Sequence, residues 1–259
     1  ATGISKSGRY VLISSYATNL VADDTNGLED VFLKDTKTGA VTLVSRTRPG
    51  APTEACYSND QAISVDKTAR YLLFICANTA PSDTSSIYRY DRKKDTTELV
   101  SLDANGAQIV GNHNRGAISG NGRFVAFYSS TAVVPEDTND DYDTYLRDLK
   151  RDKTTLLITG LGRALPDEGS LLRSMSTDAR YFSYISVSTN LDALGGNGSI
   201  YEAYRFDRKK RKNVRISIGL AGALANDASN WPILSSDGSH VTFNSEASNL
   251  TSDADNNLV

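Results

Sequence analysis

Residues 118–129 read ISGNGRFVAFYS, and weaker copies of this stretch recur along the whole chain. In each copy a polar turn with Gly or Ala near its end is followed by a short run of ring and β-branched residues. Gly accepts positive φ without strain and so suits the reversal, and an uninterrupted apolar run suits a strand covered on both faces. The ring residue after the turn marks the copies, which lie 53 to 61 residues apart at Tyr10, Tyr71, Phe124, Tyr181 and His240.

A second strand is predicted about twenty residues after each marker. It has the form DVFLKD at 30–35 and recurs at 86–91, 143–148 and 202–207. A tight polar turn and a third strand follow, and an inbound strand before each marker completes four per unit. A sheet of this size cannot bury either of its apolar faces alone, so neighbouring sheets stack radially. The sequence therefore predicts an all-β fold, a β-propeller of four-stranded antiparallel blades.

The motifs of these units resemble a known family. The combination ISxxGR(Y/F)VxF, TNL, DTN and DVFLxD is similar to the WD40-like, TolB-type propeller repeats of bacterial extracytoplasmic proteins. The resemblance covers nearly the whole chain and implies the propeller fold. It also implies a periplasmic, secreted or cell-surface location. It implies no single activity, because such repeats serve protein docking, ligand binding and scaffolding.

The chain divides into one propeller domain of five units, approximately 1–45, 46–101, 102–159, 160–218 and 219–259. The first unit has a missing or truncated inbound strand, and the last ends before its second strand can form. We expect closure into a five-bladed ring, which would remove open sheet edges. The alternative is an arc of a six- or seven-bladed ring, with the other blades supplied by another segment or chain.

Composition limits the classes of partner. The 259 residues carry a net charge of −3, which gives no general attraction to nucleic acid. No apolar stretch approaches the roughly 20 residues that span a bilayer, so no membrane span is expected. The only Met is Met175 and no signal peptide is visible, so we expect a processed product or an excerpt of a longer chain.

The two cysteines, Cys56 and Cys76, fall on the first two strands of the second unit. A hairpin there could bring them together as a disulfide, which fits an oxidising compartment. Two buried free thiols are the alternative.

Two loops share an acidic pattern, DTNGLED at 24–30 and DTNDDYD at 137–143, with a partial copy at 253–257. Oxygen-bearing side chains at the first, third and seventh places suit Ca2+, which takes six to eight oxygen ligands. Alternatively, these side chains cap turns by bonding to the backbone. Units 2 and 4 lack the pattern, so metal is not expected in every unit. The candidate ligands are Asp24, Asn26, Asp30, Asp137, Asn139 and Asp143.

Three residues that do not repeat are candidates for ligand binding. His113 and Arg115 lie in a polar segment before the third unit, and no metal spacing includes either histidine of the chain. Trp231, the only tryptophan, is expected in the core or between blades, with stacking against a sugar as the alternative. His240 replaces the marker Tyr and is expected to pack as a ring.

Two polar residues recur in each of the first four units and are assigned structural roles, because a catalytic group is needed only once. The acid that ends the second strand is expected to form an Asx turn. The arginine before the marker is expected to bond neighbouring-blade carbonyls or carboxylates. No catalytic residue is assigned. The acids are Asp35, Asp91, Asp148 and Asp207, and the arginines are Arg9, Arg70, Arg123 and Arg180.

Three functions follow from these patterns. The first is a non-catalytic binding propeller that meets a protein or glycan partner at the variable loops 21–30, 133–143 and 192–202. The second is a polysaccharide lyase or hydrolase with an axial site that uses His113 and Arg115. The third is a structural module stabilised by Ca2+, whose melting temperature would fall on chelation.

Overall fold

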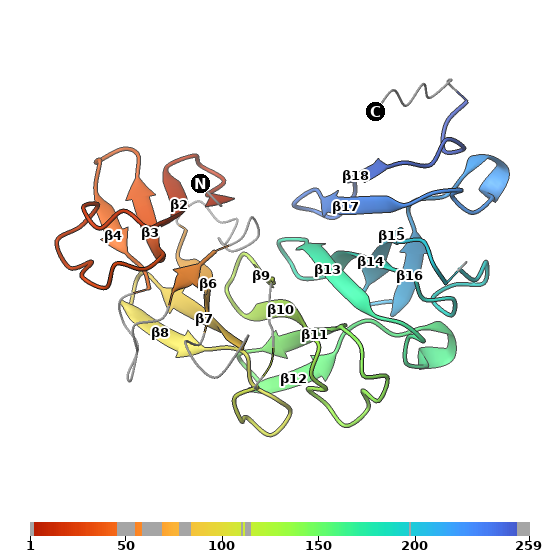
Figure 1. The fold of residues 1–259 in the computed structure, drawn as a ribbon, viewed down its shortest axis with the longest axis horizontal. Coiled ribbons are helices and arrows are strands. Elements are labelled where there is room, and N and C mark those ends of the chain that lie inside the picture. The colour runs from red at the N-terminus through yellow and green to blue at the C-terminus, as the bar shows by residue number, and fades with distance from the viewer. Residues whose placement is uncertain are drawn as a thin grey trace.

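The computed structural model describes residues 3–45, 55–58, 69–77, 84–109, 111, 115–196 and 198–252. Its strands form five antiparallel sheets that follow one another along an arc, as the predicted propeller requires (Figure 1). The first four sheets have four strands each, and the fifth has two. Within every sheet, neighbours in space are neighbours in sequence.

The strands have the following bounds. The first sheet holds β1 (Gly3–Ile4), β2 (Tyr10–Ser15), β3 (Asp30–Asp35) and β4 (Val41–Leu43), and the second holds β5 (Cys56–Tyr57), β6 (Tyr71–Ala77), β7 (Ser85–Asp91) and β8 (Thr96–Leu99). The third holds β9 (Gly116–Ile118), β10 (Phe124–Ser129), β11 (Asp143–Asp148) and β12 (Lys153–Leu156). The fourth holds β13 (Ser170–Met175), β14 (Tyr181–Ser186), β15 (Glu202–Asp207) and β16 (Lys212–Arg215), and the fifth β17 (Ser229–Leu234) and β18 (Val241–Ser245). Two 3-10 turns, η1 (Leu161–Arg163) and η2 (Leu220–Gly222), precede β13 and β17.

The described sheets form an open arc and not the expected closed ring of five. The first and fifth sheets stand at its two ends (Figure 1), and the extensive contacts between sheets all join sheets consecutive in sequence. The first sheet has its own inbound strand, the two-residue β1, so it does not take β17 or β18 to complete itself. The second of the two alternatives, an arc of propeller blades, therefore describes these residues.

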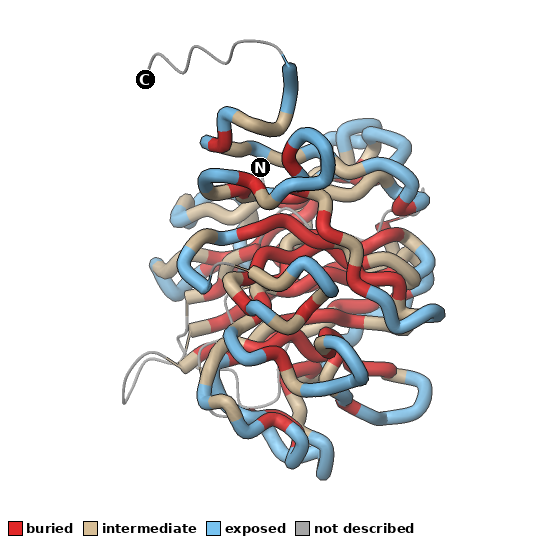
Figure 2. Tube along the Cα trace, turned by 90° about the vertical axis from the view of Figure 1, so that its right-hand side faces the viewer, coloured by how far each residue is buried: buried red, intermediate tan, exposed pale blue. Residues whose placement is uncertain are grey.

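The core consists of the stacked sheet faces. The central strands are almost continuously buried, with five successive buried residues in both β6 and β14. Figure 2 shows this buried interior lying between exposed turns. Five large rings, Tyr145, Tyr184, Phe127, Phe182 and Phe206, are at most 1% exposed. Burial of rings of this size supplies most of the free energy that holds the sheets together.

An arginine–aspartate pair repeats in each of the first four sheets. Arg9 donates from Nε and Nη2 to both carboxylate oxygens of Asp35, at 3.0 and 2.6 Å. Tyr10 lies opposite Asp35 in the register, so the preceding arginine reaches the carboxylate of its own sheet. The expected bond to a neighbouring blade is therefore replaced by one within the sheet. Backbone N–H groups bond the same carboxylates, which confirms the Asx turns. The other pairs are Arg70–Asp91, Arg123–Asp148 and Arg180–Asp207, and the N–H donors are Lys37, Lys93, Lys150 and Lys209.

Cys56 and Cys76 form a disulfide. They stand directly opposite each other in the register of β5 and β6, which is why the bond can close. Both residues are buried.

The fifth sheet departs from the packing that the repeat predicts. His240 is exposed instead of packing as a ring, and its Nδ1 lies 2.8 Å from the hydroxyl of Ser239. Tyr10 in the first sheet is covered by Arg92 of the second, whose guanidinium lies 4.5 Å from the ring centroid. Among the described residues no sheet follows the fifth, so His240 lacks such a cover.

Candidate functional site

Trp231 projects from β17, the inner strand of the fifth sheet, and its side chain is 52% exposed. The expectation of a core position is therefore wrong, whereas the expected contact between blades is present, because arginines of two other sheets lie against the ring. The pairing of β17 with β18 is interrupted between Asn230 and Ile233, and Trp231 has φ +53°. A left-handed backbone costs a non-glycine residue about 1–2 kcal/mol. The bulge turns this residue out of the normal alternation of the strand, and so decides where the indole points.

Two arginines from neighbouring inner strands face this indole. The guanidinium carbon of Arg115, just before β9, lies 5.4 Å from the ring centroid, and that of Arg173 in β13 lies 4.8 Å from it. Both are cation–π contacts. Burial raises the pKa of Tyr128 in β10, and a hydrogen bond from Arg173 together with the charges of both arginines opposes this rise. One cluster thus joins side chains from the third, fourth and fifth sheets. We call Arg115, Arg173, Trp231 and Tyr128 the axial cluster.

The axial cluster corresponds partly to the predicted ligand site. The structure brings Arg115 and Trp231 together, whereas His113 lies outside the described residues. Sequence reasoning missed Arg173 and Tyr128. Arg173 could have been found by aligning the inbound strands, since both arginines precede their marker ring by eight or nine residues. Tyr128 carries no such signal, because tyrosine is common in each of the first four units.

The side chains of the axial cluster are suited to binding a ligand. Guanidinium groups donate paired hydrogen bonds to carboxylates, and an exposed indole offers a flat apolar face. A hollow of about 200 Å3 lies beside the indole and is lined by Asn230, Asn244, Ser245 and Glu246, among others. A ligand that combines an anionic group with a flat or apolar surface fits these features.

The acidic loop of the first sheet has two buried acids, Asp24 and Asp30. Asp24 is 6% exposed and neither of its carboxylate oxygens has a hydrogen-bond partner. Asn26 bonds locally, as its Oδ1 accepts the N–H of Leu28 at 2.8 Å and its Nδ2 donates to Asp30 at 2.8 Å. The second oxygen of Asp30 accepts the hydroxyl of Ser45 at 2.5 Å. Asn26 therefore caps the turn, while the carboxylate of Asp24 stays without a partner.

The loop of the third sheet repeats this arrangement. Asp137 is 5% exposed and Asp143 fully buried, and each has one oxygen without a partner. The remaining oxygen of Asp137 accepts the hydroxyl of Tyr145, and Asp143 accepts that of Ser170 at 3.1 Å. Burial, with the charges of Asp137 and another loop acid, raises the pKa of Asp143 to about 7, although hydrogen bonds oppose this rise.

Asn139 again stabilises its loop. Its Oδ1 accepts the N–H of Asp141 at 3.2 Å, and its Nδ2 donates to the carbonyl oxygen of Pro166 at 3.1 Å. Among the described residues, no three His, Cys, Asp or Glu side chains form a group that could hold a metal ion. A cation in either loop would thus need carboxylate pairs together with other oxygens.

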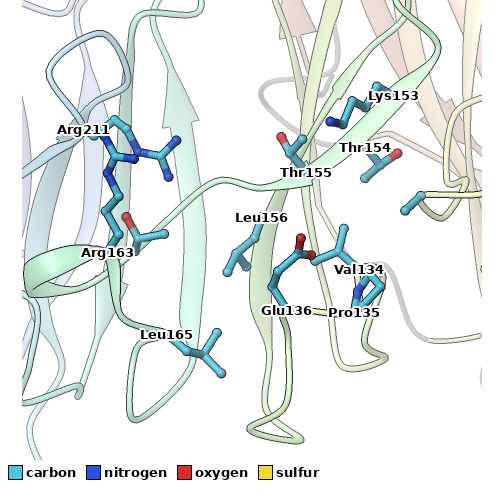
Figure 3. A pocket seen from close by; sticks show the side chains of 12 residues that line it. Val134, Pro135, Glu136, Lys153, Thr154, Thr155, Leu156, Arg163, Leu165 and Arg211 are labelled. Carbon is cyan, nitrogen blue, oxygen red and sulfur yellow. The ribbon is translucent and has the colours of Figure 1, made fainter.

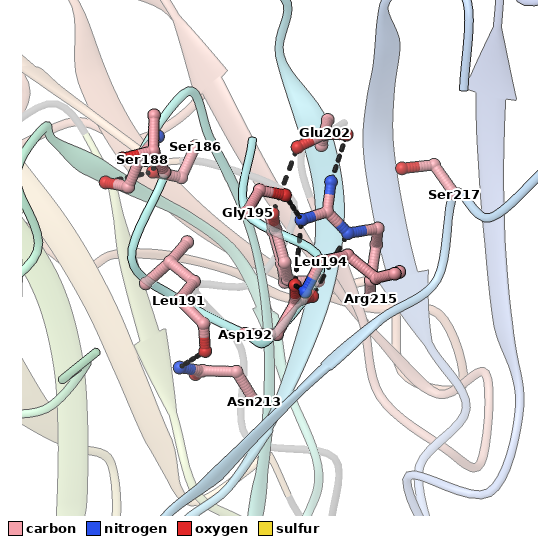
Figure 4. A network of polar contacts seen from close by, with 12 residues as sticks. Ser186, Ser188, Leu191, Asp192, Leu194, Gly195, Glu202, Asn213, Arg215 and Ser217 are labelled. Carbon is pink, nitrogen blue, oxygen red and sulfur yellow. Dashed lines mark hydrogen bonds and ion pairs between the residues drawn. The ribbon is translucent and has the colours of Figure 1, made fainter. Parts of the chain in front are cut away.

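The fourth sheet has an ion-pair network at the corresponding place (Figure 4). Arg215 in β16 is buried, donates twice to Asp192 at 3.0 Å each and once to the carbonyl of Gly195, and forms an ion pair with Glu202. Glu202 also accepts the hydroxyl of Tyr204 at 3.0 Å. Burial raises the pKa of Glu202, and Arg215 opposes that shift. The loop after β14 is thereby tied to the sheet through a single guanidinium.

A wider groove lies between the third and fourth sheets (Figure 3). It has a volume of about 460 Å3, and Arg163 and Arg211 face Glu136 and Leu156 across it. The lining mixes charges of both signs with aliphatic side chains. It contains none of the predicted ligand or metal residues, but Val134, Pro135 and Glu136 belong to the predicted partner loop 133–143.

Comparisons with known proteins support the fold. TolB from Acinetobacter baumannii matches over 93% of this chain and 47% of its own, with 15% identity and a TM-score of 0.54. The tricorn protease matches over 95% of this chain and 24% of its own, with 12% identity and a TM-score of 0.54. A putative TolB from Agrobacterium tumefaciens matches over 82% of this chain and 60% of its own, with 18% identity and a TM-score of 0.48. The chain thus spans less than two thirds of each of these proteins. No protein-family model and no curated protein matches it.

The observed sheets and the likeness to TolB from Acinetobacter baumannii define the fold class of this protein. It is an all-β protein built from four-stranded antiparallel blades, with a TolB-like propeller fold. Among the described residues, no helix has the length and apolar character needed to cross a membrane.

Proposed function

We propose that this chain is a non-catalytic binding propeller of an extracytoplasmic protein, and that its partner docks on the axial cluster. The observation that carries the proposal is the exposed indole of Trp231, held between two guanidinium groups by a strained backbone. Strain of this kind persists only where the surrounding structure imposes it, and it concentrates at functional positions. Exposed aromatic and arginine side chains are also the types that dominate binding energy at interfaces.

The rest of the molecule supports binding over catalysis. The polar residues that repeat in each sheet are engaged in turns and ion pairs within that sheet. The axial cluster offers two permanent cations, an aromatic face and a phenol, a set that recognises a carboxylate beside a flat surface. A protein segment with an acidic side chain and a glycan with a uronic acid both present such a group. The disulfide Cys56–Cys76 supports an oxidising, extracytoplasmic location.

The test uses the intrinsic fluorescence of the protein's single tryptophan. Because Trp231 is the only tryptophan, its fluorescence reads the axial cluster directly. The protein is titrated with acidic oligosaccharides, their neutral counterparts and acidic peptides. We expect a saturable change in Trp231 emission with one acidic class, weakened at least tenfold by Arg173→Ala. The exposed Arg151→Ala serves as the control and should bind like the wild type.

Two results would contradict the proposal. One is a partner that binds unchanged to both Trp231→Ala and Arg173→Ala. The other is turnover, since release of unsaturated or shortened sugar from an acidic polysaccharide would favour the alternative, a lyase or hydrolase that uses Arg115 and Tyr128 in the same cluster.

A further inference from the structure

The first and third sheets each bury a pair of carboxylates where a loop meets a strand. Asp24 and Asp30 form one pair, and Asp137 and Asp143 form the other, and all four residues are less than 9% exposed. No Lys, Arg or His among the described residues forms an ion pair with Asp24, Asp137 or Asp143. Burying a carboxylate without a counter-charge is destabilising, so a bound positive charge would stabilise these loops.

The fourth sheet shows what compensates the corresponding carboxylate there. Glu202 opens β15 as Asp30 opens β3 and Asp143 opens β11. Its partner Arg215 lies opposite Tyr204 in the register, the position taken by Leu43 opposite Phe32 and by Leu156 opposite Tyr145. The guanidinium joins Glu202 on the strand to Asp192 and Gly195 in the loop.

The other two sheets have leucine in place of that arginine, and their loop acid is closer in sequence to the strand acid than Asp192 is to Glu202. The loop acid stands six residues before the strand acid in both, and both loops carry an asparagine that caps the turn. The two oxygens of Asp24, one of Asp137 and one of Asp143 are buried and have no partner. A loop-to-strand position that holds a positive charge in the fourth sheet therefore holds unpartnered oxygens in the first and third.

We propose that the first and third sheets each bind one Ca2+ ion, between Asp24 and Asp30 and between Asp137 and Asp143, in the place that the guanidinium of Arg215 occupies in the fourth sheet. Carboxylate oxygens suit this hard cation, and backbone carbonyls and water complete its six to eight ligands. Asn26 and Asn139 act as turn caps that shape the loops. This inference is independent of the proposed binding function, because the axial cluster shares no residue with either loop.

The experiment measures Ca2+ binding to protein first stripped with EDTA. Titration calorimetry should give two Ca2+ per chain, with dissociation constants between micromolar and millimolar. Asp24→Asn and Asp137→Asn should each reduce the number to one. Asp140→Asn is the matched control, because Asp140 is an exposed acid in the same loop as Asp137, and it should still bind two.

A second readout separates the two sites and does not depend on how much a variant is destabilised. Tyr145 bonds Asp137, whereas Phe32 lies at the equivalent position in the first sheet. Tb3+ bound in the third sheet should emit when tyrosine is excited, and Tyr145→Phe should remove most of that emission while two ions still bind. An excess of Ca2+ should displace Tb3+.

Three results would overturn the proposal. The first is no heat and no rise in melting temperature with millimolar Ca2+. The second is an equal rise from NaCl at matched ionic strength. The third is Ca2+ binding that is unchanged in both Asp24→Asn and Asp137→Asn.

Discussion

Gly238 in the fifth sheet lies against Tyr181 in the fourth so closely that a Cβ on this glycine would stand 2.3 Å from the tyrosine ring. The guanidinium of Arg205 donates to the carbonyl oxygen of the same glycine at 3.0 Å and lies over the same ring. Gly122 repeats this relationship with Tyr71 between the second and third sheets. A glycine turn that packs against a tyrosine of the preceding blade is thus a recurring contact between neighbouring blades.

Gly238→Ala should weaken the packing of the fifth sheet against the fourth. The residue has φ +73°, so alanine costs about 1 kcal/mol in the backbone, and the clash with Tyr181 adds about 1–3 kcal/mol. Urea unfolding followed by Trp231 emission measures the loss at the fifth sheet. Gly8→Ala is the control, because Gly8 has φ +70° but a Cβ at this residue would have nothing within 4 Å. Equal losses in the two variants would show that the contact with Tyr181 contributes nothing.

Replacing Trp231 by glycine should be less harmful than replacing it by alanine. Both changes remove the indole, but only glycine accepts φ +53° without strain. We expect Trp231→Gly to be more stable than Trp231→Ala by about 1 kcal/mol in urea unfolding followed by circular dichroism. If the alanine variant were the more stable, the positive φ would not represent strain at this residue.

Loss of the disulfide should destabilise the second sheet. The bond joins residues 20 apart in sequence, and loops of this size gain about 3 kcal/mol from the reduced entropy of the unfolded chain. Cys56→Ser/Cys76→Ser should therefore melt at a lower temperature than the oxidised protein in a calorimetric scan. Dithiothreitol should lower the melting temperature of the wild type to that of the double variant and leave the double variant unchanged. A wild type insensitive to reduction would contradict this.

The repeated arginine–aspartate pairs should make stability depend on acidity. The bond from Arg123 lowers the pKa of Asp148, with burial opposing and backbone N–H groups adding to the shift. A carboxyl whose folded pKa is depressed stabilises the fold above its unfolded pKa, near 3.9, and the stabilisation is lost as pH falls toward the folded value. Asp148→Asn should cost about 1 kcal/mol in urea unfolding at pH 7.

The same loss should shrink below about pH 4. The exposed Glu168→Gln is the control, and its small effect should lack this pH dependence. A loss for Asp148→Asn that stays constant down to about pH 2.5, well below the unfolded pKa, would show that its charge does not matter.

Arg215→Leu should leave the buried Glu202 and the half-buried Asp192 without their counter-charge. Glu202 is 1% exposed, and removing one member of a buried ion pair costs about 3–5 kcal/mol. The second sheet has Ser86 and Leu99 at the corresponding positions, so Arg215→Leu/Glu202→Ser copies an arrangement that this chain already uses. Urea unfolding should show the double variant to be more stable than Arg215→Leu alone. The opposite order would mean that Glu202 is well accommodated without its arginine.

The repeated features of this protein could be predicted from its sequence because each depends on neighbours close along the chain. The regular spacing of the marker residues from Tyr10 to His240 located β2, β6, β10 and β14. The acid at the end of the following strand located the Asx turns, in which its carboxylate accepts the N–H two residues later. The acidic loops were also visible, since all their members lie within seven residues.

Features that depend on which sheets meet in space were not predictable in this way. The expected closure into a five-bladed ring is not found among the described sheets, because closure depends on the angle between blades. The sequence pattern did not predict the exposure of Trp231, because a bulge and a positive φ set the direction of the indole. It could not show that Arg115 and Arg173 converge on that indole from separate sheets.

The sequence by itself determined the blade, since strand periodicity and turn chemistry are local properties of a polypeptide. Tertiary structure alone decided which non-repeating side chains share a surface and which buried acids lack a counter-charge. The physical reason is that cation–π contacts and ion pairs act over a few ångströms of space. Residues such as Arg115 and Trp231 come within that range only after blades more than a hundred residues apart have stacked.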